Sequence, residues 1–470
     1  MMTSTDYGLL NPAWAGTAVA AATDDAALVQ ALLDVEAAWV AVLEDAGLCP
    51  AGTADAVDAA ADASLYDAAS LAARTADGGN VLIPLLGDLR AELKAAGAPG
   101  AAAVVHRGAT SQDIIDTALM LLAVRAGGVL RADVRRSADA LARLADAHRG
   151  TLCVARSLTQ HALPGTFGLR AANWLSGVVE AGRRLESALD AAPLQWGGAV
   201  GTLASLTDSL ASAGYDAGAR VPELTGALAA QLGLADPGAP WHTNRLPLTG
   251  LGASLADVCA AAGKVAADVL LLARPELAEL TEPREAGKGG SSAMPQKQNP
   301  VLSVLIKQAA LAAPQHAAQL FLAAGTAVDE RPDGAWHAEW AALRELLRLA
   351  GGSAAKLASL AEGLGVHPEA MARNAALSGD LLVSERLMAR LAPALGKGDA
   401  AAGKARIQAA VRDSLGGGGE LRELLRAGLP DGAMDPADFD ALFHPSGYLG
   451  QADAFIDAAL ARHRHLRKES

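Results

Sequence analysis

The chain has 470 residues and a formal net charge of −13, because 52 acidic residues outnumber 39 lysines and arginines. Nucleic-acid-binding proteins usually carry an excess of basic residues, which this chain does not have. Its hydrophobic content of 51% is too high for an intrinsically disordered chain. The length exceeds that of a usual single core, and the aromatic content of only 3%, beside abundant Ala and Leu, favours helices over a β-sandwich.

Helical periodicity recurs along the chain from the first fifty residues onward. Large apolar side chains repeat at i, i+3, i+7, i+8 and i+11, and a second stripe follows a polar start at 110–113. The residues of these stripes are Leu32, Val35, Trp39, Val40 and Leu43, and then Ile115, Leu119 and Leu122. No alternating strand pattern with hairpin turns is evident, so the sequence predicts an all-α protein.

The spacing of Gly and Pro clusters predicts three helical domains. Residues 1–107 are expected to form a small N-terminal domain and residues 108–355 a central bundle of unusually long helices. Residues 356–470 are expected to form a C-terminal domain, which the flexible run Gly416–Gly419 divides.

The cysteines and the apolar stretches bear on location and on metals. Cys49, Cys153 and Cys259 are odd in number, far apart and outside any zinc-ligand spacing, which favours a reducing cytoplasm and no structural metal. The apolar stretch 262–273 is too short to span a bilayer, and the N-terminus lacks a secretory pattern. We therefore expect a cytoplasmic protein without membrane or nucleic-acid partners.

Three polar, partly Gly-rich segments interrupt the helical pattern. Their sequences are HRGATSQD at 106–113, RSLTQHALP at 156–164 and GKGGSSAMPQKQNP at 287–300. Polar residues between apolar helices are costly unless they bind something, so these segments are the candidate site.

The third segment combines glycines, two hydroxyls and a cation. Glycines let the backbone present N–H groups to an anion, and a serine there can exchange a proton with a carbon acid near Lys297. The alternative is a solvated linker between helices. The order of residues does not match a phosphate-binding Walker loop.

These residues are also recognisable as a pattern. GSSAMPQKQNP at 290–300 resembles the signature of the fumarase/aspartase superfamily, whose members add or eliminate across a carbon–carbon bond next to a carboxylate. Segments 106–118 and 156–168 resemble the other two active-site regions of that superfamily, in the same order. The resemblance implies a three-domain helical fold with a long central bundle. It also implies a homotetramer whose active sites are each built from three chains.

Two residues that the superfamily usually carries are missing. Where most members have a histidine and a glutamate, this chain has Leu158 and Val304. In those members the pair forms a charge relay that helps to protonate a poor leaving group. A carboxylate, whose conjugate acid has a pKa of about 4, leaves without a proton. The sequence therefore points to internal carboxylate addition to a double bond, which is lactonisation.

Other segments resemble one branch of the superfamily, the bacterial 3-carboxy-cis,cis-muconate cycloisomerases. They are 195–202, 240–245, 330–340 and 448–452, although this branch usually has a tryptophan where Leu158 stands. The resemblance implies an intramolecular lyase that closes 3-carboxy-cis,cis-muconate to 4-carboxymuconolactone in protocatechuate breakdown, within the β-ketoadipate route of aromatic catabolism.

A substrate with three carboxylates requires a cationic pocket, for which arginine forks are suited. The predicted catalytic residues are Ser291, Ser292 and His161, of which one serine is the proton carrier. The predicted substrate-binding residues are His106, Arg107, Thr110, Ser111, Gln112, Arg156, Thr159, Gln160, Lys297, Asn299, Arg331 and His337. We expect no metal and no cofactor.

Structural roles remain open for several of these residues. Arg107 and Arg156 are alternatively paired with local acids, His337 is alternatively a core histidine bonded to a carbonyl, and Thr110–Gln112 alternatively caps a helix. Two other functions also remain open. They are an adenylosuccinate- or argininosuccinate-type lyase of the same superfamily and a non-catalytic helical assembly protein.

Overall fold

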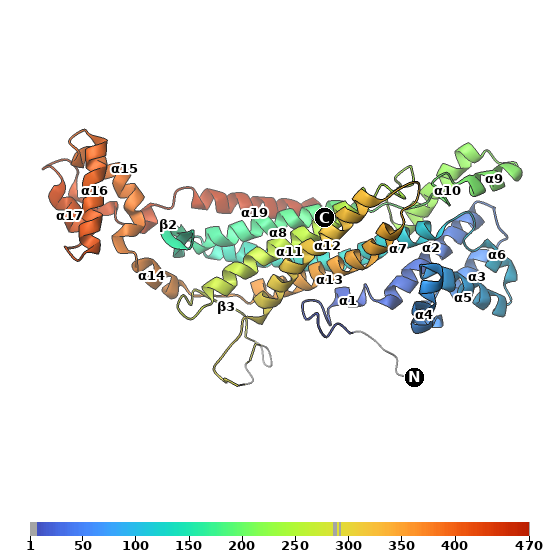
Figure 1. Ribbon diagram of the computed structural model, residues 1–470. Helices are drawn as coiled ribbons and strands as arrows, with labels where there is room; N and C mark the ends of the chain where they lie inside the picture. The colour runs from blue at the N-terminus through green and yellow to red at the C-terminus, as the bar shows by residue number, and fades with distance from the viewer. Residues whose placement is uncertain (1–6, 285–288, 291–292, 470) are drawn as a thin grey trace. The chain divides into compact units, whose positions relative to one another are not determined.

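The computed structural model describes residues 7–284, 289–290 and 293–469 (Figure 1). Helices dominate this part of the chain, and its strands are confined to two two-stranded sheets. The predicted helical class is confirmed. Five long helices follow one another through the middle of the chain: α7 (Ser111–Ala147), α8 (Phe167–Asp190), α11 (Leu246–Leu272), α12 (Val301–Thr326) and α13 (Gly334–Glu362).

The chain divides into two compact units. Unit 1 comprises residues 1–136, 180–266 and 302–358, and unit 2 comprises residues 137–179, 267–301 and 359–470. The division at 107/108 and 355/356 into three domains stays a prediction.

The shorter elements belong to one unit each. Those of unit 1 are α1 (Ala18–Ala21), α2 (Asp25–Asp45), α3 (Thr53–Ala60), η1 (Ala63–Leu65), α4 (Ala68–Gly78), α5 (Leu82–Ala95), α6 (Pro99–Val104), α9 (Ala204–Ser212) and α10 (Ala217–Leu232). Those of unit 2 are β1 (Leu152–Ser157), β2 (Gln160–Thr166), β3 (Leu280–Thr281), β4 (Gly365–Val366), α14 (Pro368–Ala376), η2 (Gly379–Val383), α15 (Ser384–Leu395), α16 (Ala400–Leu415), α17 (Leu421–Gly428), α18 (Pro436–Ala441), η3 (Pro445–Gly447) and α19 (Ala452–Glu469).

The core of unit 1 contains the predicted apolar stripes. All five stripe residues of α2 are fully buried, and those of α7 are at most 4% exposed. Asp24 caps α2, because its side chain accepts the backbone N–H of Ala27 at 2.8 Å. By length and composition α2 is apolar enough to cross a membrane, but 61% of that window is buried inside the protein, as in a core helix.

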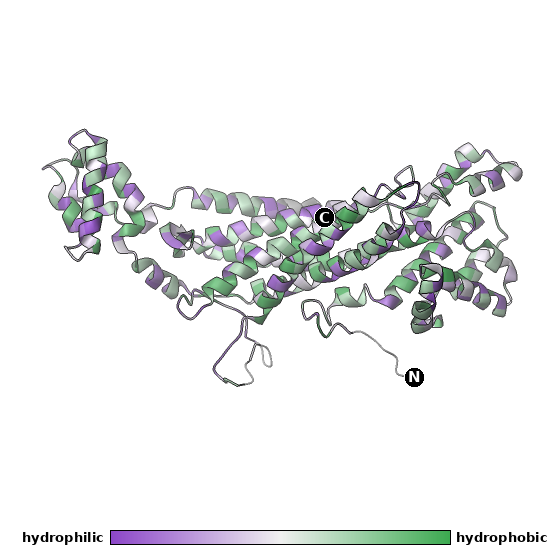
Figure 2. Ribbon diagram, in the orientation of Figure 1, coloured by the Kyte–Doolittle hydropathy of each residue, from purple (hydrophilic) through white to green (hydrophobic). Residues whose placement is uncertain are grey.

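Small residues let the long helices of unit 1 approach closely. A Cβ added at Gly263 of α11 would lie 2.4 Å from the Cβ of Ala310 of α12, and one at Gly252 would lie 2.4 Å from Leu320. Figure 2 shows hydrophobic residues along α11 and α12. The contact between these helices therefore depends on the absence of side chains at two positions of α11.

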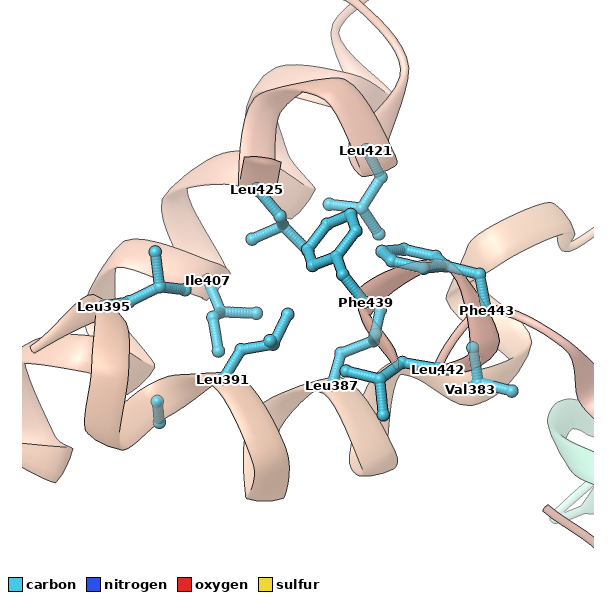
Figure 3. Close-up of a cluster of buried hydrophobic side chains, with 11 residues drawn as sticks. Val383, Leu387, Leu391, Leu395, Ile407, Leu421, Leu425, Phe439, Leu442 and Phe443 are labelled. Atoms are coloured by element: carbon cyan, nitrogen blue, oxygen red, sulfur yellow. The ribbon is translucent and has the colours of Figure 1, made fainter. Parts of the chain in front are cut away.

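The C-terminal helices of unit 2 surround a separate apolar cluster (Figure 3). Leucines of α15 and α17 pack there with Ile407 of α16 and with two phenylalanines, Phe439 and Phe443, whose ring centroids are 5.1 Å apart. The guanidinium groups of Arg422 and Arg426 cover these rings at 4.7 and 4.9 Å, so that the cluster is closed on one side by cation–π contacts.

The absence of hairpins was a wrong prediction. Strands β1 and β2 form an antiparallel hairpin in which Ser157 pairs with Gln160, so that Leu158 and Thr159 alone make the turn. Their φ angles are +49° and +70°, in the left-handed region that two-residue hairpin turns require. Asn and Gly usually occupy such turns, and the second strand contains Pro164, which is why no strand signal was visible.

Candidate functional site

The N-terminus of α7 is held by the carboxylate of Asp113. Its Oδ2 accepts the backbone N–H of Thr110 at 3.0 Å, in the manner of a capping box. Both of its oxygens also accept backbone N–H groups of the 197–198 turn at 2.8 Å, and Oδ1 lies 3.1 Å from Nε2 of His242. Asp113 is completely buried, and these contacts fix the first turn of the helix.

Arg331 meets this helix start. Its Nη1 donates to the hydroxyl of Thr110 at 2.8 Å, and its Nε donates to Oε1 of Gln112 at 3.4 Å. No carboxylate pairs with the half-buried Arg331 within the described part of the chain. The predicted binding residues Thr110 and Gln112 therefore meet Arg331, which is more than 200 positions away in the sequence, beside Ser111 at the first position of α7.

A buried ion cluster lies behind Gln112. Arg245 donates to both carboxylate oxygens of Asp116, at 2.6 and 3.0 Å, and to Oε2 of Glu339 at 2.6 Å. All three side chains are at most 1% exposed, and Nε1 of Trp336 adds a hydrogen bond to Asp116 at 2.8 Å. Burial raises the pKa of the Glu339 carboxyl, against the lowering effect of Arg245.

Sequence reasoning did not select Asp113, Asp116, Arg245 or Glu339. A partial signal existed for Asp113, because an acid at the third position of a helix after Thr or Ser is a capping pattern. For the ion cluster the sequence carried no signal, because its members come from α7, from the residue before α11 and from α13.

The other predicted residues of unit 1 contact their own surroundings. Nδ1 of His106 lies 2.7 Å from Glu36, and Arg107 donates to the carbonyl oxygen of Leu48 at 2.9 Å rather than to an acid. His337 is exposed rather than in the core, and its ring nitrogens lie 3.2 and 3.0 Å from the carbonyl oxygens of Asp333 and Gly79. The carbonyl contact that was the alternative for His337 is therefore present.

In unit 2, Arg156 does pair with a local acid. Its Nη2 lies 2.7 Å from the completely buried Glu279, which also accepts from Asn374 at 2.8 Å. Thr159 lies at the hairpin turn, where it accepts from Nε2 of Gln160 at 3.3 Å. Nδ1 of His161 lies 2.8 Å from the hydroxyl of Ser378.

The signature segment is described only in part, and Ser291 and Ser292 lie outside the described residues. At its stem, Asn299 donates its N–H to the carbonyl oxygen of Gly289 at 2.7 Å, and Gly290 pairs with Gln298 as an isolated antiparallel bridge. Gly289 has a φ of +72°, and a Cβ there would lie 2.8 Å from the backbone carbonyl oxygen of Asn299, so glycine is favoured at this position. Lys297 is exposed in this loop.

Across residues 7–284, 289–290 and 293–469, no three His, Cys, Asp or Glu side chains are grouped so that they could hold a metal ion.

Comparisons with known proteins identify the family. A family model described as lyase matches residues 11–314. The nitrosuccinate lyase of Streptomyces davaonensis is 45% identical over 457 residues, covering 97% of this chain and 94% of its own. The 3-carboxy-cis,cis-muconate cycloisomerase of Bradyrhizobium diazoefficiens is 40% identical over 454 residues, covering 96% and 97%.

Solved structures agree with these matches. The 3-carboxy-cis,cis-muconate lactonizing enzyme of Pseudomonas putida superposes with a TM-score of 0.85 at 33% identity, covering 97% of this chain and 99% of its own. The three polar segments suggested a resemblance to this superfamily, and the matches extend that resemblance over nearly the whole chain. The protein belongs to the lyase family of the fumarase/aspartase superfamily.

Proposed function

We propose that this enzyme eliminates or adds a weakly basic anion across a carbon–carbon bond next to a carboxylate. The observation that carries the proposal is the apolar side chain at both relay positions. Leu158, at the hairpin turn, is 93% exposed, and Val304, on the first turns of α12, is 50% exposed. Neither can hold or move a proton, so a leaving group that must be protonated, such as an amine, would not be assisted.

The first candidate substrate is nitrosuccinate. A base takes the proton from the carbon next to the nitro-bearing carbon, the carbon–nitrogen bond breaks, and its electron pair leaves with nitrite. The products are a butenedioate and nitrite, and nitrite leaves as an anion without a proton. A relative that is 45% identical and is named nitrosuccinate lyase supports this choice.

The second candidate is lactonisation of 3-carboxy-cis,cis-muconate. Here an internal carboxylate oxygen forms a bond to one carbon of the diene, and the neighbouring carbon takes a proton. The 40% identical cycloisomerase, the lactonizing enzyme with a TM-score of 0.85 and the resemblance of segment 330–340 support this choice. In the reverse direction the leaving group is again an unprotonated carboxylate.

Both reactions assign the same tasks to the chain. Arg331, with the hydroxyl of Thr110 beside it, binds a substrate carboxylate, and Lys297 supplies a further cation. His161 is held at Nδ1 by Ser378, which leaves its Nε2 available for proton transfer. Ser291 or Ser292 is the proposed group that exchanges the proton at carbon. No step needs a redox cofactor, because no electrons are transferred to or from an acceptor, and the proposed proton exchange by a serine does not require a Lewis acid.

The test is a parallel assay of four substrates. Nitrite release is measured with nitrosuccinate, and loss of the diene absorbance is measured with 3-carboxy-cis,cis-muconate. Adenylosuccinate and argininosuccinate report on the amine-eliminating alternative. We expect turnover with one of the first two and none with the amines. Turnover confined to an amine substrate would refute the leaving-group argument, and no turnover with any substrate would favour a non-catalytic protein.

Two variants test the proton carrier. Ser291→Ala and Ser292→Ala are expected to differ, one abolishing turnover with little change in KM, because the hydroxyl acts as charge develops at carbon. Full turnover in both variants would remove the serines from the mechanism.

We further propose a homotetramer with active sites shared between chains, located in the cytoplasm. An exposed apolar stripe on α12 supports assembly, since Leu311 and Leu322 are 68% and 64% exposed in the single chain. Three free thiols support a reducing compartment. Light scattering after size-exclusion chromatography should give the mass of four 47.4 kDa chains, and a monomer would contradict the shared site.

A further inference from the structure

The side-chain amide of Gln112 has a single orientation. Its Nε2 donates to Oδ2 of Asp116 at 3.1 Å and to the carbonyl oxygen of His242 at 2.8 Å. These two acceptors use both N–H bonds of the amide, so Oε1 must be the atom that faces Nε of Arg331. The completely buried Gln112 is thereby fixed as an acceptor for Arg331.

Asp116 is itself held in place from the other side. Its Oδ2 also accepts Nη1 of Arg245, and its Oδ1 accepts Nη2 of Arg245 and Nε1 of Trp336. Glu339 occupies the remaining edge of Arg245, at Nε and Nη2. Rotation of Asp116 would leave several buried donors unpaired, and an unpaired buried donor costs free energy of folding.

Arg331 keeps its charge unpaired in this arrangement. Of the five N–H bonds of its guanidinium, one goes to the hydroxyl of Thr110 and one to the amide oxygen of Gln112, both neutral acceptors. Three N–H bonds remain for a ligand. Arg245, by contrast, lies between two carboxylates and has no such capacity.

We propose that Gln112 is a neutral spacer between the buried ion cluster and Arg331. The cluster of Asp116, Arg245 and Glu339 positions the amide, and the amide positions the guanidinium without neutralising it. Arg331 therefore stays available to a substrate carboxylate. This inference rests on the proposed role of Arg331 in binding substrate, and it assigns Gln112 and Asp116 as positioning residues.

The direct test is Gln112→Glu, which preserves shape, puts a carboxylate oxygen beside Arg331, and puts a second oxygen in place of the Nε2 that donates to Asp116 and to the carbonyl of His242. Binding of succinate, an unreactive dicarboxylate, is measured by calorimetry between pH 5.5 and 9. At high pH the new carboxylate pairs with Arg331, and we expect the dissociation constant for succinate to be about tenfold higher than that of the unchanged protein.

The pH profile separates positioning from a general structural role. As the pH falls, the introduced acid becomes protonated, because its second oxygen faces the buried Asp116 carboxylate and a proton between them restores the lost hydrogen bond. The ratio of the two dissociation constants should then return towards one. Using the ratio at each pH removes the titration of succinate itself. Gln408→Glu, the same change at an exposed position of α16, is the matched control and should give a ratio of one throughout.

A second pair of variants tests the cluster. Asp116→Asn places an N–H group against donors and frees Gln112, so it should raise the succinate dissociation constant about tenfold. Glu339→Gln leaves the contact between Asp116 and Gln112 intact and should change it by less than about threefold. This comparison decides the matter if the Gln112 variant does not fold.

Three results would overturn the inference. They are a ratio for Gln112→Glu that does not depend on pH, equal effects of the two cluster variants, and no succinate binding by the unchanged protein. Turnover of nitrosuccinate and 3-carboxy-cis,cis-muconate is measured separately. Loss of the proposed function therefore appears as absent turnover, whereas failure of the spacer role appears in succinate binding.

Discussion

Replacing Arg331 by alanine should weaken productive substrate binding strongly while leaving the protein folded. The variant loses two hydrogen bonds to neutral acceptors, which contribute about 1 kcal/mol each to stability. Gln112 stays anchored through its Nε2, and the half-buried hydroxyl oxygen of Thr110 loses only one donor, so no buried charge is left unpaired.

The cost to catalysis should be larger than the cost to folding. When a half-buried guanidinium that pairs with a substrate carboxylate is removed, the free energy of substrate binding weakens by about 2–4 kcal/mol. At 1.4 kcal/mol per factor of ten, kcat/KM should fall by about 30- to 700-fold. Arg331→Lys should recover little of this, because a single ammonium cannot replace the planar fork.

The assay is initial-rate kinetics with whichever of the two candidate substrates turns over, beside thermal unfolding of each variant. Arg183→Ala is the matched control, since Arg183 forms an exposed pair with Glu180. Near-normal kinetics in the Arg331→Ala variant would place this residue outside the site. An equal loss in the control would show that the effect is not local.

Three further outcomes are expected. Introducing the relay pair by Leu158→His with Val304→Glu should lower turnover of the preferred substrate. Both positions are exposed in the single chain, but in the proposed tetramer the new charges would have to be desolvated at the shared site without serving a leaving group. Increased turnover would reverse the leaving-group argument. Changing the hairpin turn by Leu158→Asn with Thr159→Gly should raise the midpoint of thermal unfolding, because Asn and Gly adopt the left-handed φ angles of +49° and +70° with less strain. An unchanged or lower midpoint would show that Leu158 and Thr159 are not strained at the turn. Burial raises the pKa of Tyr66 to about 12 in the folded protein, so this side chain ionises first in the unfolded chain. The free energy of unfolding should therefore fall as the pH rises from about 10 to 12, and Tyr66→Phe should reduce that loss when chemical unfolding is measured across this range.

Local patterns in the sequence were sufficient for the helical class and for the family. The apolar stripe on α2 repeats every three to four residues, and its members are all buried, because a helix brings such positions to one face whatever its surroundings. The signature at 290–300 is contiguous, so no folding is needed to read it. Both features depend on residues that are neighbours along the chain.

The hairpin and the partners of the charged residues depended on contacts that no local pattern encodes. Leu158 and Thr159 are poor turn residues by intrinsic preference, and only the pairing of β1 with β2 holds them at positive φ. Arg156 was ambiguous between a ligand and a local acid until Glu279, 123 positions away, was found beside it.

The sequence by itself therefore determined that this protein is helical and that it carries the superfamily's polar segments in order. Only the tertiary structure decided which charged residues can bind a ligand and which are already paired with opposite charges. Arg245 and Arg331 are both arginines near motif residues, yet one is neutralised between Asp116 and Glu339 while the other meets only neutral acceptors. That difference arises from the packing of α7 against residues near the starts of α11 and α13, because the charge available at a site depends on what burial has already paired.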